Sequence, residues 1–334
     1  MAHQDTDVGQ IDSMGEILLD DLAVAEQVLK VKEERNAVIL AHNYQRPEVQ
    51  DIADFTGDSL GLSREAAKTD ADVIVFCGVH FMAETAHILS PQKVVLLPEM
   101  MAGCPLADMA EAGQVARARE ENPGAVVVSY VNTTAEVKAV SDYCCTSSNA
   151  VHVVRAVEGD RVLFVPDRNL GRYVADRVDK EVILWDGYCS THDRITVEQV
   201  ESALEAHPGA EVIAHPECRP EVLAVSDHIH STSGMADAAL RSNAVEFIVA
   251  TESGMLYPLG KAAPGNSFYS PAEEPLCPTM KLTTLASVLW ALQTLEPRIT
   301  LPEEIRVRAL GAVERMLALR PFPPGGEGWD GGGL

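Results

Sequence analysis

The feature that most constrains the fold of this chain is a pattern that occurs three times. Each copy has an apolar run followed by three residues, most of which carry imidazole, phenol, amide or carboxylate groups. The three triplets are His42-Asn43-Tyr44, Tyr130-Val131-Asn132 and His215-Pro216-Glu217, at offsets of 88 and then 85 residues. Because a pattern that recurs at a nearly fixed spacing is typical of repeated structural units, we expect three similar units.

Two further columns of residues keep the same two offsets. One column is acidic and the other carries hydroxyl groups; the members are Asp54, Asp142, Asp227, Ser59, Ser147 and Thr232. Three cysteines, Cys104, Cys189 and Cys277, are also about one repeat apart, with gaps of 85 and 88 residues. One cysteine per unit, at matching places, suggests three ligands that converge on a single central group.

Each unit has the same predicted order of elements. Short β-branched runs without polar alternation predict strands that are covered on both faces. They fall at 37–41, 73–76 and 94–97, at 125–129, 162–165 and 182–184, and at 212–214, 247–249 and 267–269. Helical patterning passes through each member of the acidic column and follows each member of the hydroxyl column, whose residues are good helix N-caps.

Strands that alternate with helices predict βαβ crossovers and parallel sheets. The predicted fold class is α/β, with three αβα units of three strands each around a pseudo-threefold axis. The predicted units are 15–105, 106–190 and 191–279, and C-terminal helices within 280–320 complete the first unit. Amphipathic stretches at 17–30 and 280–295 are expected to pack against the first unit. Residues 1–14 and 321–334 are expected to be flexible tails.

The net charge narrows the range of partners. The formal charge is -24 at pH 7, which argues against nucleic acid and anionic membranes because both would be repelled. The N-terminal segment lacks the apolar stretch of a secretory signal, and no apolar run approaches the ~20 residues that span a bilayer. We therefore expect a cytoplasmic protein whose seven cysteines are thiols or metal ligands rather than disulfides.

Three converging cysteines could hold zinc or an iron–sulfur cluster. Structural zinc is usually held by four closely paired ligands, and the chain has no CxxC pair. A 4Fe–4S cluster normally takes four cysteines, so a cluster on three has one iron with an open position. Such an iron can act as a Lewis acid toward a substrate hydroxyl or carboxylate.

The remaining thiols are interpreted differently. Cys77 ends an apolar strand and is expected to be a buried apolar residue. Cys144 and Cys145 are adjacent, cannot easily chelate one metal, and are expected to be structural. Cys218 has no counterpart in the other units and is left out of the ligand set.

The polar columns predict a single cavity. Ligands of open α/β sheets bind beyond the carboxyl ends of the strands, where the triplets lie. Helix N-termini attract anions, so the hydroxyl column predicts a binding wall for carboxylates and phosphate. Six residues of the triplets are proton donors and acceptors at strand ends, and their His, Glu and Tyr members can serve as general acids or bases. They are His42, Tyr44, Tyr130, Asn132, His215 and Glu217. The acidic column is interpreted as structural, with each carboxylate tying the loop that follows through backbone N–H groups.

Seven motifs together resemble the quinolinate synthase A family of bacterial NAD biosynthesis. They are AHNYQRPEVQDIADFTGDSL (41–60), FMAETAHIL (81–89), SYVNTTAEVKA (129–139), CTSSNA (145–150), AHPEC (214–218), STSGM (231–235) and CPTMKLTTL (277–285). The resemblance covers nearly the whole chain apart from the tails. It implies three αβα domains around a pseudo-threefold axis and a 4Fe–4S cluster on Cys104, Cys189 and Cys277.

The resemblance also implies a reaction and a set of roles. The reaction is condensation of iminoaspartate with dihydroxyacetone phosphate to quinolinate, phosphate and two waters, with a possible handover from an iminoaspartate-producing oxidase. Tyr44 and Glu217 would carry proton transfers, with His42 and His215 near the reacting carbons. The substrate-binding set is His42, Ser59, Tyr130, Val131, Asn132, Ser147, His215, Pro216, Glu217 and Thr232.

Two other functions remain open from the residues alone. One is a different iron–sulfur hydro-lyase that uses the same Lewis-acid iron. The other is a non-enzymatic module, stabilised by zinc or sensing redox state. An anaerobic assay with iminoaspartate and dihydroxyacetone phosphate would distinguish the first alternative from a quinolinate synthase. Metal analysis of anaerobically purified protein would distinguish the second.

Overall fold

The computed structural model describes residues 8–271 and 275–319, and the side chains of the long first helix from residue 21 onward. Of the predicted N-terminal tail, residues 8–14 belong to this helix, α1 (Val8–Glu34). Residues 1–7 and the predicted C-terminal tail, 321–334, lie outside the described residues. The limits predicted for the three units stay predictions.

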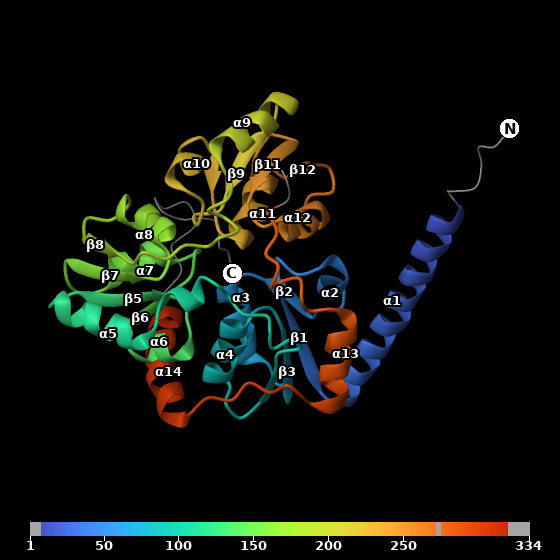
Figure 1. The fold of residues 1–334 in the computed structure, drawn as a ribbon, viewed down its shortest axis with the longest axis horizontal. Helices are drawn as coiled ribbons and strands as arrows, with labels where there is room; N and C mark the ends of the chain where they lie inside the picture. The colour runs from blue at the N-terminus through green and yellow to red at the C-terminus, as the bar shows by residue number, and fades with distance from the viewer. Residues whose placement is uncertain (1–7, 272–274, 320–334) are drawn as a thin grey trace.

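Three four-stranded parallel sheets form the framework, and the order of strands is the same in each. The first sheet is β2 (Phe55–Gly57), β1 (Ala37–His42), β3 (Val73–Cys77) and β4 (Val94–Leu96); the second is β6 (Tyr143–Cys145), β5 (Val126–Tyr130), β7 (Arg161–Val165) and β8 (Glu181–Leu184); the third is β10 (His228–Ile229), β9 (Glu211–Ala214), β11 (Glu246–Ala250) and β12 (Ser267–Tyr269). Figure 1 shows them as three lobes around a common centre. The α/β class predicted from the repeat is confirmed.

The register of the strands repeats as well. Leu40 pairs with Phe55 between β1 and β2, and adding the first offset gives the pairing of Val128 with Tyr143 between β5 and β6. In the third sheet the corresponding pair is Ile213 with His228. The three copies are therefore matched at the level of single hydrogen-bonded residues, which a loose similarity between βαβ units would not produce.

The prediction of three strands per sheet is wrong, because each sheet has a fourth, edge strand. The missed strands are β2, β6 and β10, which have three, three and two residues. Strands this short carry no readable alternation, so the sequence pattern does not separate them from the helical stretch before them and the Ser/Thr/Gly-rich break after them. The helices there are short and end before each edge strand: α2 (Pro47–Asp51), α6 (Ala135–Ala139) and α10 (Pro220–Ala224).

The acidic column holds each sheet together by one repeated contact. A carboxylate oxygen of Asp54 accepts the backbone N–H of Ile39, and the same contact joins Asp142 to Val127, each at 2.8 Å. In the third unit Asp227 accepts the N–H of Val212 at 2.8 Å. The column is structural, as predicted, but it ties back to the preceding strand rather than to the following loop. An Asp just before an edge strand can satisfy an N–H that the short strand leaves unpaired.

The remaining helices cover the sheets and bridge them. They are α3 (Ser59–Lys68), α4 (His80–Leu89), α5 (Ala112–Glu121), α7 (Ala150–Ala156), α8 (Arg168–Ala175), α9 (Val197–Ala206), α11 (Thr232–Arg241), α12 (Leu256–Ala262), α13 (Leu285–Thr294) and α14 (Glu303–Ala318), with 3₁₀ turns η1 (Ala107–Met109) and η2 (Ser253–Met255). As predicted, α1 and α13 pack on each other and on the first sheet. The last helix, α14, instead packs against α6, β6 and α4, and so joins the second unit to the first.

Buried apolar residues explain why α1 and α13 pack on the first sheet. Val28 of α1 and Leu292 of α13 are fully buried in one cluster with Ile39 and Val75 of the first sheet. The predicted helix 280–295 begins later, at Leu285, because the Thr284 side chain accepts the backbone N–H of Ser287 in a capping box. Among the described residues, no helix combines the length and apolar character that crossing a membrane requires.

Candidate active site

A cavity lies where the carboxyl ends of the three sheets meet. The strands β1 and β5 end at His42 and Tyr130, and His215 directly follows β9. The cavity is lined by predicted residues from all three units: His42, Tyr44, Ser59, Cys104, Tyr130, Asn132, Ser147, Cys189, His215, Glu217, Thr232 and Cys277. Residues up to 235 positions apart in the chain therefore form one wall.

Two members of the predicted substrate-binding set do not line this cavity. Val131 is 2% exposed and packs in the main core, and its backbone N–H donates to the carbonyl of Cys145 at 2.8 Å. Pro216 is buried between His215 and Glu217. Their side chains therefore face protein, and any contribution to binding would come from their backbone.

The three cysteines approach the cavity from matching loops. Cys104, Cys189 and Cys277 follow the last strands of their sheets, are half-buried, and form no disulfide. Burial, with smaller contributions from the charges of Cys277 and Glu217, raises the pKa of Cys104 to about 12, against hydrogen bonds from Ala107 and Leu106. Burial and the Glu217 charge likewise raise the pKa of Cys189. A bound cation would reverse this balance, because metal ligation deprotonates thiols.

The other four thiols are buried and outside the lining. Burial raises the pKa of Cys77, Cys144, Cys145 and Cys218. The Cys218 thiol donates to the carbonyl of Ala250 at 3.2 Å. None of the four lines the cavity of the three cysteines, and the predicted ligand set stays a prediction.

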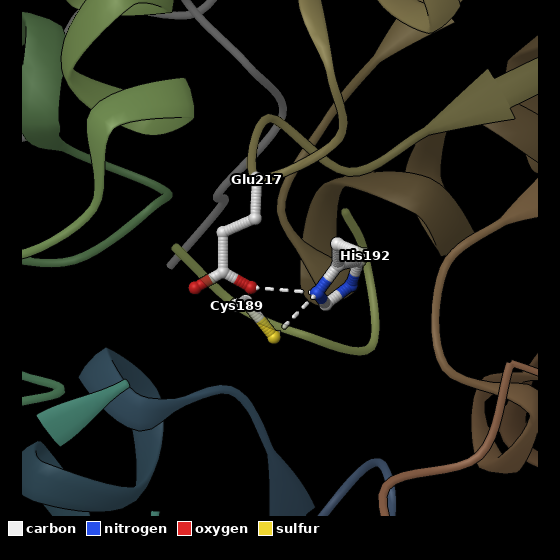
Figure 2. Close-up of side chains that lie close together, drawn as sticks. All are labelled: Cys189, His192 and Glu217. Carbon is white, nitrogen blue, oxygen red and sulfur yellow. Dashed lines mark hydrogen bonds and ion pairs between the residues drawn. The ribbon is translucent and has the colours of Figure 1, made fainter. Parts of the chain in front are cut away.

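A second potential ligand group overlaps the first. Figure 2 shows the carboxylate of Glu217 and the sulfur of Cys189 both facing the ring of His192. The Nδ1 atom of His192 lies 2.9 Å from Glu217 Oε2 and 3.2 Å from Cys189 Sγ. One ligand atom from each lies within 4.8 Å of the others, so the three residues could hold a metal ion.

His192 is the most important residue that the sequence analysis missed. Its signal was its position three residues after Cys189, in a Cys-x-x-His arrangement that places both side chains on one turn. It has no counterpart in the repeated columns, and the search for repeats therefore passed over it.

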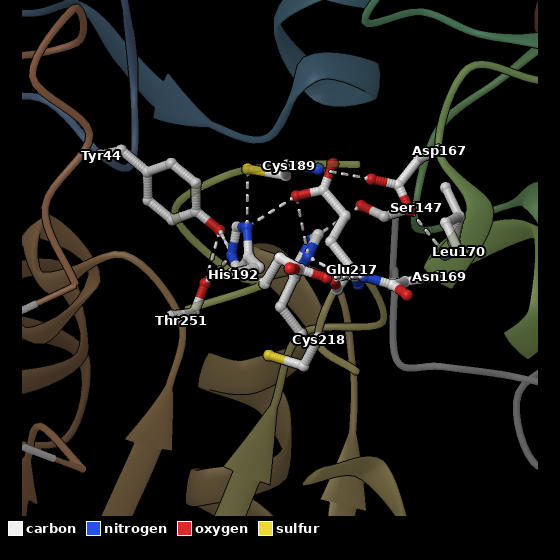
Figure 3. A network of polar contacts seen from close by, with 12 residues as sticks. Tyr44, Ser147, Asp167, Asn169, Leu170, Cys189, His192, Glu217, Cys218 and Thr251 are labelled. Carbon is white, nitrogen blue, oxygen red and sulfur yellow. Dashed lines mark hydrogen bonds and ion pairs between the residues drawn. The ribbon is translucent and has the colours of Figure 1, made fainter. Parts of the chain in front are cut away.

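His192 also joins Glu217 to Tyr44 through a chain of polar contacts (Figure 3). Its Nε2 atom lies 2.9 Å from the hydroxyl of Thr251, which is in turn 2.6 Å from the hydroxyl of Tyr44. Both predicted proton carriers are therefore connected through buried groups. Thr251 was also missed, because it follows the apolar strand β11 without any charged signal.

The two ends of this series of polar contacts have opposite pKa shifts. Burial alone would raise the pKa of Glu217, but the adjacent His192 and His215 outweigh it and hold that pKa well below its usual range. Burial and the Glu217 charge raise the pKa of Tyr44 well above 10. Near neutral pH, Glu217 is therefore a carboxylate and Tyr44 a protonated phenol.

The two histidines of the triplets occupy equivalent positions. The N–H of Tyr44 lies 3.1 Å from His42 Nδ1, and the N–H of Glu217 lies 3.3 Å from His215 Nδ1. Burial and the charge of His215 lower the pKa of His42 to about 3, and burial lowers that of His215 as well. Both rings are neutral, and His215 Nε2 faces the Ser147 hydroxyl at 3.2 Å.

Two of the three hydroxyl-column residues begin helices. Ser59 opens α3 behind the cap Asp58, and Thr232 opens α11 behind the cap Ser231. The prediction is wrong for Ser147, because α7 begins three residues later at Ala150.

The four residues from 146 to 149 form a turn that explains this later start. The Asn149 side chain accepts the N–H of Thr146 at 2.7 Å, and the Thr146 hydroxyl contacts that of Ser148 at 2.8 Å. Ser147 therefore reaches the cavity from a turn rather than from a helix start.

Two buried acceptors of the cavity wall have no hydrogen-bond partner among the described residues. They are Glu217 Oε1 and Asn132 Oδ1. A buried oxygen without a donor is costly unless a ligand satisfies it. The wall is thus built to receive a molecule that carries hydrogen-bond donors, such as hydroxyl or N–H groups.

Comparison with known proteins places these features in a family. The model of the family described as "Quinolinate synthetase A protein" matches residues 26–318. The chain is 56% identical over 302 residues to a quinolinate synthase of Desulforudis audaxviator, covering 90% of this chain and 99% of that one. It is 55% identical to the quinolinate synthase of Methanoregula boonei, over 90% and 100% of the two chains.

Proposed function

The chain belongs to the quinolinate synthetase A protein family, enzymes of NAD biosynthesis, and we propose that it condenses iminoaspartate with dihydroxyacetone phosphate. The products would be quinolinate, phosphate and two waters, which balance the atoms of the two substrates. Iminoaspartate would be handed over by an oxidase that produces it. The single observation that carries the proposal is the convergence of twelve predicted residues on one cavity.

We propose that Cys104, Cys189 and Cys277 hold a 4Fe–4S cluster. Three thiols that line one cavity without forming disulfides fit such a group, because thiolates are soft ligands that select iron–sulfur clusters or zinc. When bound, the cluster would supply a Lewis acid for the dehydration that completes the aromatic ring.

The acid–base roles follow from the positions of two buried residues that one series of polar contacts connects. Glu217 would accept a proton at Oε1, the oxygen that has no hydrogen-bond partner among the described residues. Tyr44 would donate from its phenol, and Thr251 and His192 hold that hydroxyl in place. His42 and His215, both neutral, would orient the reacting carbons and donate from a ring nitrogen.

The remaining wall would bind the carboxylates and the phosphate. Ser59 and Thr232 lie at the starts of ten-residue helices, where free N–H groups and the helix dipole favour anions. Ser147, Tyr130 and Asn132 would add neutral polar contacts, and Val131 and Pro216 could add only backbone ones. Burial raises the pKa of Tyr130 well above 10, so its phenol stays a donor.

An anaerobic steady-state assay tests the proposal. Protein with a full complement of iron and sulfide should form quinolinate from iminoaspartate and dihydroxyacetone phosphate, detected by its ultraviolet absorbance. A fully loaded protein that forms none would contradict the proposal and favour another iron–sulfur hydro-lyase.

A further inference from the structure

The loop that carries each cavity cysteine is fastened by the same backbone hydrogen bond. In every unit the donor lies just beyond the central strand β3, β7 or β11, and the acceptor lies two residues before the cysteine. The three bonds are His80 N–H to Ala102 O at 2.8 Å, Arg168 N–H to Gly187 O at 2.8 Å and Ser253 N–H to Pro275 O at 3.0 Å. One clasp is therefore common to all three cysteine loops.

Two of the loops have a second bond, made by a buried carboxylate to the cysteine itself. The N–H of Cys189 donates to Asp167 Oδ2 at 3.0 Å, and the N–H of Cys277 donates to Glu252 Oε1 at 3.1 Å. Asp167 and Glu252 are 85 residues apart, so they occupy one column of the repeat. The first unit has Val79 in that column, and a valine side chain cannot accept a hydrogen bond.

Asp167 is built firmly into its position. It is fully buried, and its other oxygen accepts the N–H of Leu170 at 2.8 Å, which caps α8. The cysteine loop presses against it so closely that a Cβ on Gly187 would lie 2.3 Å from the carbonyl oxygen of Pro166. Only glycine allows this approach.

Glu252 is held in the same manner in the third unit. It accepts the N–H of Gly254 at 2.7 Å and pairs with Lys281 at 3.0 Å, while 1% of its surface is exposed. The Lys281 ammonium also donates to the carbonyl of Tyr44. Burying a carboxylate is costly unless hydrogen bonds or an opposite charge compensate for the lost water. Both buried carboxylates accept the backbone N–H of a cysteine.

The first cysteine is stabilised in another way. Hydrogen bonds from the backbone N–H groups of Leu106 and Ala107 reach the sulfur of Cys104 directly. The sulfur of Cys189 also receives a backbone hydrogen bond, from His192. Among the described residues, the difference is that the second and third loops direct a cysteine amide at a carboxylate and the first does not. The backbone clasp is therefore common to the three ligand loops, whereas the second bond differs between them although their sheets are copies.

We propose that Asp167 and Glu252 are positioning residues, each of which fixes one cluster-bearing loop by accepting the backbone N–H of its cysteine. This inference rests on the cluster of the proposed function. The two carboxylates would hold Cys189 and Cys277 in place before the cluster binds, as residues behind metal ligands do elsewhere.

Anaerobic loss of iron to a chelator tests this role, with the reconstituted full-length protein and iron release followed by absorbance. Asp167→Ala and Glu252→Ala should each lose iron about 10- to 100-fold faster than wild type, the usual cost of removing such a partner. Glu252→Asp keeps a carboxylate, the side chain that the second unit uses at this place, and should recover most of the retention.

Matched controls come from the acidic column. Asp142→Ala and Asp227→Ala each remove a carboxylate that accepts a backbone N–H at 2.8 Å in the same two units, far along the chain from the cysteines. They should lower the melting temperature but keep iron at the wild-type rate. Equal iron loss in Asp167→Ala and Asp142→Ala would overturn the positioning role alone. A wild type that takes up no cluster would overturn the proposed function together with this inference.

Discussion

The frame of three sheets and the wall of the cavity both derive from the threefold repeat. The frame keeps the same contact in each copy, whereas the wall has different residues at matching positions. In the frame, Asp54, Asp142 and Asp227 make one contact three times at the same distance. In the wall, the position of His42 is Tyr130 in the second unit and that of Tyr44 is Asn132. A symmetric frame brings three strand ends to one place, and an unsymmetric wall would give the two substrates of the proposed reaction different surroundings.

The ionisation states of the wall residues also differ between the units. The third unit supplies the ionised Glu217, and the first supplies Tyr44, which burial keeps protonated. Burial also keeps the histidines of these two units neutral. Substitutions in the frame should therefore lower the free energy of unfolding and leave turnover unchanged. Substitutions in the wall should lower turnover and leave the free energy of unfolding near neutral pH close to wild type.

The largest effect should come from the cysteines. Cys189→Ser should abolish stable cluster binding, since three thiolates are already one fewer than the usual set. Iron and sulfide content after anaerobic reconstitution is the measurement. Cys218→Ser is the control and should retain both, because its thiol donates to Ala250 rather than facing the cavity; loss of cluster from the control would show that the ligand set is wrong.

The second-largest effect should come from Glu217→Gln, which should reduce turnover and leave the framework intact. An amide cannot accept the proton at Oε1, so turnover should fall about 10²- to 10⁴-fold, with cluster content and unfolding midpoint close to wild type. Single-turnover formation of quinolinate is the measurement. Glu221→Gln, an exposed change in the following helix α10, should keep the wild-type rate. A wild-type rate from Glu217→Gln would remove it from the proton-transfer chain.

A pH titration of stability tests the buried wall itself. The pKa of His42 is about 3 in the folded protein, against about 6.5 when unfolded. The unfolded state therefore binds the proton first, and the free energy of unfolding should fall by up to about 1.4 kcal/mol per unit as pH drops below about 6.5.

Urea unfolding of cluster-free protein between pH 7 and pH 4 measures this slope. His42→Asn should flatten it, whereas the same change at His207, which stacks on Tyr269 outside the cavity, should not. An unchanged slope in His42→Asn would mean that this ring is not held neutral by burial.

The smallest effect should come from the frame. Asp142→Ala leaves the buried N–H of Val127 without its acceptor, which costs about 1–3 kcal/mol of unfolding free energy. Urea denaturation measures the loss, and the KM values of the cluster-loaded enzyme should stay at wild type. A large change in KM with unchanged stability would contradict the division between frame and wall.

The sequence predicted the frame well because the repeat fixes it residue by residue. It missed β2, β6 and β10, since strands of two or three residues have too little pattern to distinguish them from turns. It placed twelve residues of the wall, because those recur in columns at strand ends.

The sequence missed residues that lie outside complete columns. His192 belongs to a single unit, and its Cys-x-x-His spacing was the only local signal. Asp167 and Glu252 form a column that is interrupted by Val79, so no threefold match marked them. Their roles depend on which backbone N–H groups they face, and that information requires the fold.

The central claim is that three copies of one frame bring three cysteines to a single cluster. The most direct test is the iron and acid-labile sulfide content of wild-type protein purified without oxygen. The account predicts about four irons and four sulfides per chain, as a 4Fe–4S cluster requires. One zinc per chain, or a colourless protein that is fully stable without metal, would contradict it.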